Sequence, residues 1–212
     1  MQLIEHYLSI QGEGLHPGQL AYFVRFARCN LRCAWCDSAY TFGPGREVPF
    51  SAAARAIRTS KSRFVCLTGG EPLLHREDCL NLIRAFPKLH FDIETGGSLD
   101  IRPYLKPNVS VIMDWKLKSS NMGRKMMASN LDCLRPKADL IKLVTDFSTA
   151  EIAEMKRLIQ RTEKSDVPVS IQPVQGTSPQ KIADWAVRLK NPRVRVNLQL
   201  HKLIWPRRRR GV

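Results

Sequence analysis

The sequence predicts an α/β fold in which a curved parallel sheet forms a truncated, partly open barrel. Short apolar segments alternate with amphipathic helical segments along most of the chain. This alternation is typical of successive strand–helix–strand units with right-handed crossovers. The strands are fewer than the eight of a closed (β/α)8 barrel. No stretch of linker composition divides the chain, so we expect one domain over residues 1–212.

The predicted strands are rich in Val, Ile, Leu and Phe, and several are almost continuously apolar. Such strands are expected where helices or a barrel wall cover both faces of a sheet. The predicted strands are Leu20–Ala27, Phe64–Thr68, His90–Glu94, Val109–Asp114, Leu140–Thr145, Val167–Pro173 and Val194–Leu200.

Four helices are predicted between these strands from apolar residues at helical spacing. Ser51–Thr59 begins with a serine at the expected N-cap. Ser148–Arg161 begins with Ser-Thr-Ala-Glu, which is the pattern of a capping box. His75–Ala85 and Ser178–Leu189 complete the set.

Polar or glycine-rich segments follow six of the predicted strands. The carboxyl ends of parallel strands meet at one edge of a sheet or barrel, so we expect these segments to surround a common site. The segments are the cysteine loop at 29–36, Thr68–Pro72, Glu94–Gly97, Asp114–Lys116, Gln172–Gln175 and Gln199–Lys202.

The cysteine loop has the spacing C-x3-C-x2-C at Cys29, Cys33 and Cys36. Three thiolates on one loop can hold three corners of a cubane iron–sulfur cluster and leave the fourth iron open to a cofactor or substrate. The alternatives are structural zinc, which requires four ligands, and unligated or disulfide-bonded cysteines. His16 and His75 are the flanking histidines, and neither has a zinc-finger spacing. The spacing therefore favours a cluster that performs chemistry.

Composition indicates an ordinary globular chain, with 43% hydrophobic and 25% charged residues. The net charge of +15 is spread along the chain, and only Arg207–Arg210 forms a block. No nucleic-acid motif accompanies this charge, so we do not expect nucleic-acid binding. We see no signal peptide and no apolar run of membrane-spanning length, and expect a cytoplasmic location. Cys66, Cys79 and Cys133 are expected to be buried or bystander thiols.

The cysteine spacing, followed by Gly69-Gly70-Glu71-Pro72, resembles the motifs of the radical S-adenosylmethionine (SAM) superfamily. The resemblance implies a (β/α)6-type truncated barrel, a [4Fe–4S] cluster and SAM bound to its open iron. Reductive cleavage of SAM would then yield a 5′-deoxyadenosyl radical. Gly69 and Gly70 would allow close approach to a ligand, and Glu71 could accept hydrogen bonds from an ammonium group.

A narrower resemblance is to the 7-carboxy-7-deazaguanine synthases of queuosine biosynthesis. It rests on Ser9–Gly14, Cys36-Asp37-Ser38 and Gln199–Lys202, and it extends over essentially the whole chain. It implies conversion of 6-carboxy-5,6,7,8-tetrahydropterin to 7-carboxy-7-deazaguanine with loss of ammonia. SAM would act catalytically, and Mg²⁺ would hold the substrate carboxylate. It also implies a homodimer and an electron donor such as flavodoxin or ferredoxin.

The family motifs imply three sets of site residues and no catalytic side chain, because the radical forms on SAM. The cluster ligands are Cys29, Cys33 and Cys36, and Ser38 stands where a threonine usually binds magnesium. The SAM set is Trp35, Cys36, Asp37, Gly70, Glu71, Asp114, Trp115, Lys116, Gln172, Pro173, Val174 and Gln175. The substrate set is Ile10, Gln11, Gly12, Glu13, Arg25, Thr68, His201 and Val212, the last through a terminal carboxylate.

Other interpretations remain open from the sequence. Arg25 could extend to solvent from an apolar strand, His201 could be an ordinary strand-end histidine, and Trp115 could be a core residue. A radical SAM activase would share the cluster motif but act on a different substrate. A zinc- or RNA-binding protein would be colourless, with a steep salt dependence of RNA affinity.

Overall fold

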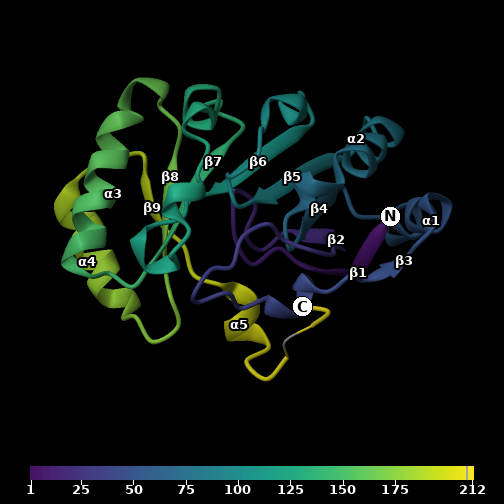
Figure 1. Cartoon of the computed structure of the whole chain (residues 1–212), viewed down its shortest axis with the longest axis horizontal. Helices are drawn as coiled ribbons and strands as arrows, with labels where there is room; N and C mark the ends of the chain where they lie inside the picture. Colours follow the sequence, from purple (N-terminus) through teal and green to yellow (C-terminus); the bar gives the residue numbers. More distant parts are fainter. Residues whose placement is uncertain (209) are drawn as a thin grey trace.

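In the computed structural model, which describes residues 1–208 and 210–212, nine strands form one open sheet (Figure 1). The strand order is β3-β1-β2-β4-β5-β6-β7-β8-β9. From β2 onward each neighbour is parallel, whereas β1 is antiparallel to both β2 and β3. The strands are β1 Gln2–Ile10, β2 Leu20–Phe26, β3 Arg46–Glu47, β4 Phe64–Gly69, β5 His90–Thr95, β6 Val109–Asp114, β7 Leu140–Thr145, β8 Val169–Pro173 and β9 Val194–Val196.

Four helices cover the outer side of the curved sheet, and a short fifth helix lies across its open side (Figure 1). The outer helices are α1 Phe50–Ser60, α2 Arg76–Ala85, α3 Thr149–Arg161 and α4 Pro179–Leu189, and the fifth is α5 Leu200–Ile204. The main apolar core contains residues of α1–α4 and of strands from β1 to β8. A second, smaller apolar cluster contains Ala21, Phe23 and Cys66, and Phe23 lines the cavity together with polar side chains. The predicted parallel, partly open barrel is therefore confirmed.

The C-terminal segment contacts β1 and the β1–β2 loop at the open side of the barrel. The backbone N–H of Leu200 donates to the carbonyl of Gly12 at 3.2 Å. A Cβ atom at Gly12 would collide with the imidazole of His201. The hydroxyl of Tyr7 donates to the main-chain oxygen of Val212 at 2.8 Å. The C-terminal segment thus closes one side of the barrel interior.

Three sequence predictions for the elements need correction. Strand β1 was not predicted, because Glu5 and His6 interrupt its apolar pattern; pairing with β2 forms it nonetheless. The last strand ends at Val196, so the segment Gln199–Lys202 does not end a strand. Its last three residues belong to α5, and Gln199 precedes that helix. Helix α1 begins at Phe50 after Pro49, without a side-chain cap.

The predicted capping box at the start of α3 is only half formed. The Ser148 hydroxyl accepts from the Glu151 N–H at 3.5 Å. The buried Glu151 carboxylate, however, accepts from the Thr145 hydroxyl at 2.7 Å and from the Ser119 N–H at 2.8 Å. The Ser119 hydroxyl in turn accepts from Nε1 of Trp35 at 3.0 Å. Helix α3 therefore positions the cysteine loop through the loop that follows β6.

No described helix is long and apolar enough to cross a membrane.

The two glycines after β4 are required by the backbone of the cysteine loop. The Gly70 N–H donates to the Phe26 carbonyl at 3.1 Å, and the Glu71 N–H donates to the Arg28 carbonyl at 2.9 Å. A Cβ atom at Gly70 would overlap that Arg28 carbonyl. The glycine pair thus allows two protein segments to approach, where the sequence had suggested approach to a ligand.

Replacing Gly70 with alanine should therefore destabilise the protein by about 1–3 kcal/mol, the usual cost of overpacking. Gly43→Ala is the matched control, because a Cβ at Gly43 meets no atom within 4 Å and its φ is −68°. Urea denaturation under anaerobic conditions measures both variants. Equal stability of the two variants would contradict the assigned role of Gly70.

Candidate active site

A cavity of about 540 Å³ lies at the carboxyl ends of the parallel strands. The cysteine loop borders it on one side, and the β1–β2 loop and α5 border it on the other. All eight residues of the predicted substrate set line this cavity, together with Ser38, the three loop cysteines and ten of the twelve residues of the predicted SAM set. The fold thus brings most of the predicted site together.

The three loop cysteines are free, half-buried and exposed to the cavity. Three thiolates on one loop can each bind a different iron of a cubane cluster and leave the fourth iron without a protein ligand.

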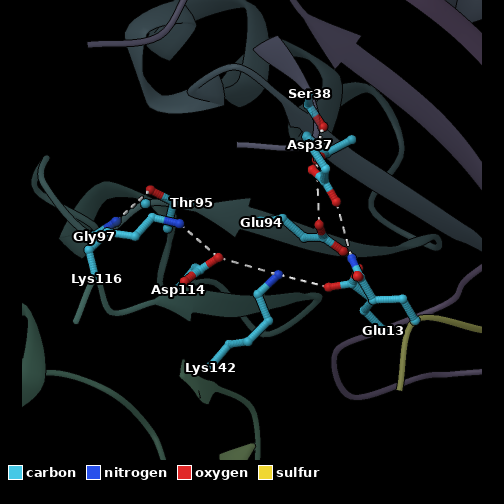
Figure 2. Close-up of polar contacts among 12 residues, drawn as sticks. Glu13, Asp37, Ser38, Glu94, Thr95, Gly97, Asp114, Lys116 and Lys142 are labelled. Atoms are coloured by element: carbon cyan, nitrogen blue, oxygen red, sulfur yellow. Dashed lines mark hydrogen bonds and ion pairs between the residues drawn. The ribbon is translucent and has the colours of Figure 1, made fainter. Parts of the chain in front are cut away.

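A chain of buried charges crosses the floor of the cavity (Figure 2). Lys116 pairs with Asp114 at 2.9 Å, and Asp114 lies 3.5 Å from Lys142. Lys142 pairs with Glu13 at 2.8 Å. Asp114 and Lys142 are partners in the β6–β7 register, so the sheet itself sets their contact. Opposite charges alternate along the chain, which offsets the cost of burying them.

The charge chain keeps Glu13 ionised. Burial would raise the pKa of Glu13, but the Lys142 ammonium and the Gln199 amide lower it below the ordinary value. Burial would likewise lower the pKa of Lys142, but Glu13 and Asp114 raise it well above the ordinary value. Glu13 therefore stays ionised at neutral pH as the partner of Lys142 on the cavity wall.

Helix α5 links the β1–β2 loop to the cysteine loop. The Gln199 amide donates to Glu13 at 2.7 Å and to Asp37 at 3.3 Å. Lys202 pairs with Asp37 at 2.7 Å. Burial would raise the pKa of Asp37, but Lys202 holds it well below the ordinary value.

Arg25 faces the cavity and does not extend to solvent. Its Nε donates to Glu5 at 2.9 Å, and its Nη2 donates to the Tyr7 hydroxyl at 2.8 Å. Burial raises the pKa of Tyr7 to about 12, so the phenol keeps its proton and donates it to Val212. Arg25 is thus a fixed cation on the cavity wall.

Glu71 borders the cavity, but its carboxylate is already occupied by protein donors. It accepts from the Leu73 N–H at 3.0 Å, the Thr95 hydroxyl at 2.8 Å and the Gly96 N–H at 2.7 Å. The side chain therefore fixes the turn after β5. These three bonds leave about one of the four acceptor positions of the carboxylate, and its contact with an ammonium group stays a prediction.

The comparisons with known proteins agree with this geometry. The family model of the radical SAM superfamily matches residues 23–112, which include the cysteine loop. A 7-carboxy-7-deazaguanine synthase of Clostridium acetobutylicum is 36% identical over all of this chain and 99% of the relative. One from Thermoplasma acidophilum is 34% identical over 97% of each chain.

This chain belongs to the 7-carboxy-7-deazaguanine synthase family. The crystal structure of QueE from Escherichia coli has the same fold, with a TM-score of 0.72 and 23% identity over 93% of this chain and 92% of that one. Membership of the radical SAM superfamily brings with it a [4Fe–4S] cluster and SAM.

The residues of this 7-carboxy-7-deazaguanine synthase family member fit those cofactors. Cys29, Cys33 and Cys36 supply three thiolates to the cavity, and no other cysteine lines it. The Lys116 ammonium lies 5.1 Å from the centre of the Trp35 ring, in cation–π contact beside the cysteine loop. It provides a positive charge where an anionic thiolate cluster would bind.

Two members of the predicted SAM set do not reach the cavity. Trp115 packs against the core, because it alternates with the inward-facing Asp114 and Lys116. Gln172 is buried, and its amide has no hydrogen-bond partner among the described residues. Neither side chain lines the cavity, and a contact of either with SAM stays a prediction.

Sequence reasoning gave no specific role to five polar residues that line the cavity: Glu94, Thr95, Lys142, Gln199 and Lys202. Lys142 lies inside an apolar strand, where an inward-facing charge was the available signal, whereas Glu94 and Thr95 were noted only as part of a strand-end segment. Gln11 donates to Glu94 at 3.3 Å, and burial raises the pKa of that carboxyl. Gln199 and Lys202 were noted only as part of a motif, because a strand was expected there.

Replacing Lys142 with methionine should destabilise the protein by about 3–5 kcal/mol, because it leaves Glu13 and Asp114 buried without a counter-charge. Lys202→Met is the matched control. Its pair with Asp37 is exposed by 42% and 51%, so its loss should cost at most about 1 kcal/mol. Urea denaturation measures the free energy of unfolding of both variants. A similar loss of stability in the two would contradict the importance of the buried charges.

Proposed function

We propose that this protein is a radical SAM carbon–nitrogen lyase that converts 6-carboxy-5,6,7,8-tetrahydropterin to 7-carboxy-7-deazaguanine. Ammonia is lost, and SAM acts catalytically in queuosine and 7-deazapurine biosynthesis. Residues 1–212 act as one radical SAM domain. One observation supports this most directly: a single cavity has three free cysteines on one side and the charged groups Glu13 and Arg25 on the other.

The cluster side of the cavity binds SAM. When bound, the cluster and SAM supply an organic radical that takes a hydrogen atom from the substrate. Trp35, Asp37, Gly70, Asp114 and Lys116 border this side, with the Pro173–Gln175 turn. Carboxylates suit the amino group of SAM, and the Lys116 ammonium suits its carboxylate.

The opposite side of the cavity binds the pterin. The ionised Glu13 carboxylate accepts the N–H edge of the pterin ring, while the fixed Arg25 guanidinium holds its carboxylate. Ile10, Gln11, Gly12, Thr68, His201 and Val212 complete this wall. The closing contact between Gly12 and α5 keeps bulk water from this side.

Ser38 and Asp37 hold magnesium at the mouth of the site. The Ser38 hydroxyl donates to Asp37 at 3.0 Å, and both side chains line the cavity. Hydroxyl and carboxylate oxygens are ligands that Mg²⁺ accepts, usually together with water and substrate oxygens. Serine keeps the oxygen of the usual threonine, so the metal role is retained.

The protein acts as a homodimer in the cytoplasm and takes electrons from a flavodoxin or ferredoxin. A net charge of +15 favours association with an acidic electron carrier. Exposed apolar side chains at β9, α4 and α5 favour a dimer contact. They are Val187, Val196, Leu198, Leu203 and Ile204.

The reconstituted protein should turn over 6-carboxytetrahydropterin to 7-carboxy-7-deazaguanine with dithionite, SAM and Mg²⁺ under anaerobic conditions. Cys33→Ala should abolish product, because it removes a cluster ligand. Cys133→Ala, a cysteine outside the cavity, should retain activity. A brown protein that cleaves SAM but leaves the pterin unchanged would favour the activase alternative. A colourless, zinc-loaded protein would contradict both the synthase and the activase assignments.

Ser38→Ala should raise the Mg²⁺ concentration for half-maximal activity about tenfold or more, because it removes one oxygen ligand. Ser38→Thr is the control and should preserve the wild-type value. The measurement is initial rate against Mg²⁺ at saturating SAM. An unchanged Mg²⁺ dependence in Ser38→Ala would remove Ser38 from the metal site.

A further inference from the structure

A second group of ligand-type side chains lies at the opposite end of the barrel from the cavity. His16 belongs to the β1–β2 loop, and His90 and Asp92 lie at the start of β5. One ligand atom from each residue lies within 4.8 Å of the other two. Nδ1 of His16 is 3.0 Å from both Asp92 oxygens, and Nε2 of His90 is 3.4 Å from one of them.

These distances match a small coordination sphere. Ligands about 2.0–2.1 Å from a tetrahedral zinc ion are separated by about 3.3 Å. Two imidazoles and one carboxylate are a donor set that suits Zn²⁺ and similar first-row divalent ions. The Asp92 side chain is only 3% exposed, while the histidines are 27% and 30% exposed. An ion there would be reached from solvent and would keep one position for water.

Neighbouring side chains hold both imidazoles in place. The Phe64 ring lies 4.9 Å from the His16 ring and 5.6 Å from the His90 ring, between ring centres. The Ser110 hydroxyl, on the sheet partner of Asp92, lies 3.0 Å from the same Nε2 of His90, so a bound ion replaces this hydrogen bond. Such packing fixes ligands before an ion binds.

We propose that His16, His90 and Asp92 form a binding site for a Zn²⁺-type divalent ion, separate from the cluster and from the magnesium site. The site joins the β1–β2 loop to β5. The loop carries Glu13 three residues before His16, and β5 carries Glu94 two residues after Asp92 on the same face, about 7 Å away. A bound metal ion thus fixes the β1–β2 loop and β5 relative to each other beneath the cavity, and it stabilises the folded protein.

The test uses untagged protein with the cluster reconstituted and Mg²⁺ saturating, so that cysteine and oxygen sites are filled. Zn²⁺ is titrated, and bound zinc is counted after gel filtration. We expect one zinc per chain and a higher melting temperature with zinc. His16→Gln and His90→Gln should each weaken zinc binding about tenfold or more and abolish the shift in melting temperature.

His6→Gln is the matched control, because it removes another partly buried histidine, which contacts Tyr22 and none of the three ligands. It should bind zinc like wild type. Cobalt in place of zinc should give weak visible bands and no new thiolate charge-transfer band in the difference spectrum against the same cluster-loaded protein without cobalt. Absence of the extra zinc, unchanged affinity in both histidine variants, or a thiolate band would each overturn the proposal.

Discussion

The ammonium of Lys142 holds together parts of the chain that are far apart in sequence. It contacts Glu13 from the β1–β2 loop and Asp114 from β6, and Glu13 in turn accepts from Gln199 before α5. Each of these charges would be costly to bury alone. Because they neutralise one another, the barrel can keep a polar interior without filling it with apolar side chains. The cavity and its charge distribution both depend on that balance.

The glycines of the two sequence motifs serve close packing between protein segments. Gly70 lets the end of β4 pass beneath the cysteine loop, and Gly12 lets α5 approach the β1–β2 loop. In both cases the partner is backbone or a side chain of the same chain. Glu71 adds to this arrangement by fixing the turn after β5. These motif residues therefore determine the shape of the cavity walls against which the ligands bind.

Strand β5 connects the two ends of the barrel interior. Its inward-facing carboxylates alternate with core residues, so that Asp92 lies at one end and Glu94 lines the cavity at the other. The surroundings of Asp92 and Glu94 shift the pKa values of the two carboxyls in opposite directions. Burial raises the pKa of both carboxyls, but two histidines lower that of Asp92 below its ordinary value, whereas Glu94 keeps a raised pKa among other carboxylates. One strand thus carries one carboxyl whose pKa is lowered and one whose pKa is raised.

The sequence by itself determined the parallel strands, most helices, the cysteine loop and the glycine motifs, because periodicity and spacing are local properties. It did not determine β1, whose pairing with β2 outweighs its interrupted apolar pattern, or α5, which forms where a strand was expected. Lys142 became a site residue only when the sheet register placed it beside Asp114, and Glu94 received its contact with Gln11 only when the β1–β2 loop folded against β5. Trp115 does not line the cavity, because strand alternation places its side chain against the core. Which charges meet in the interior is a property of register and curvature, and only the tertiary structure decides it.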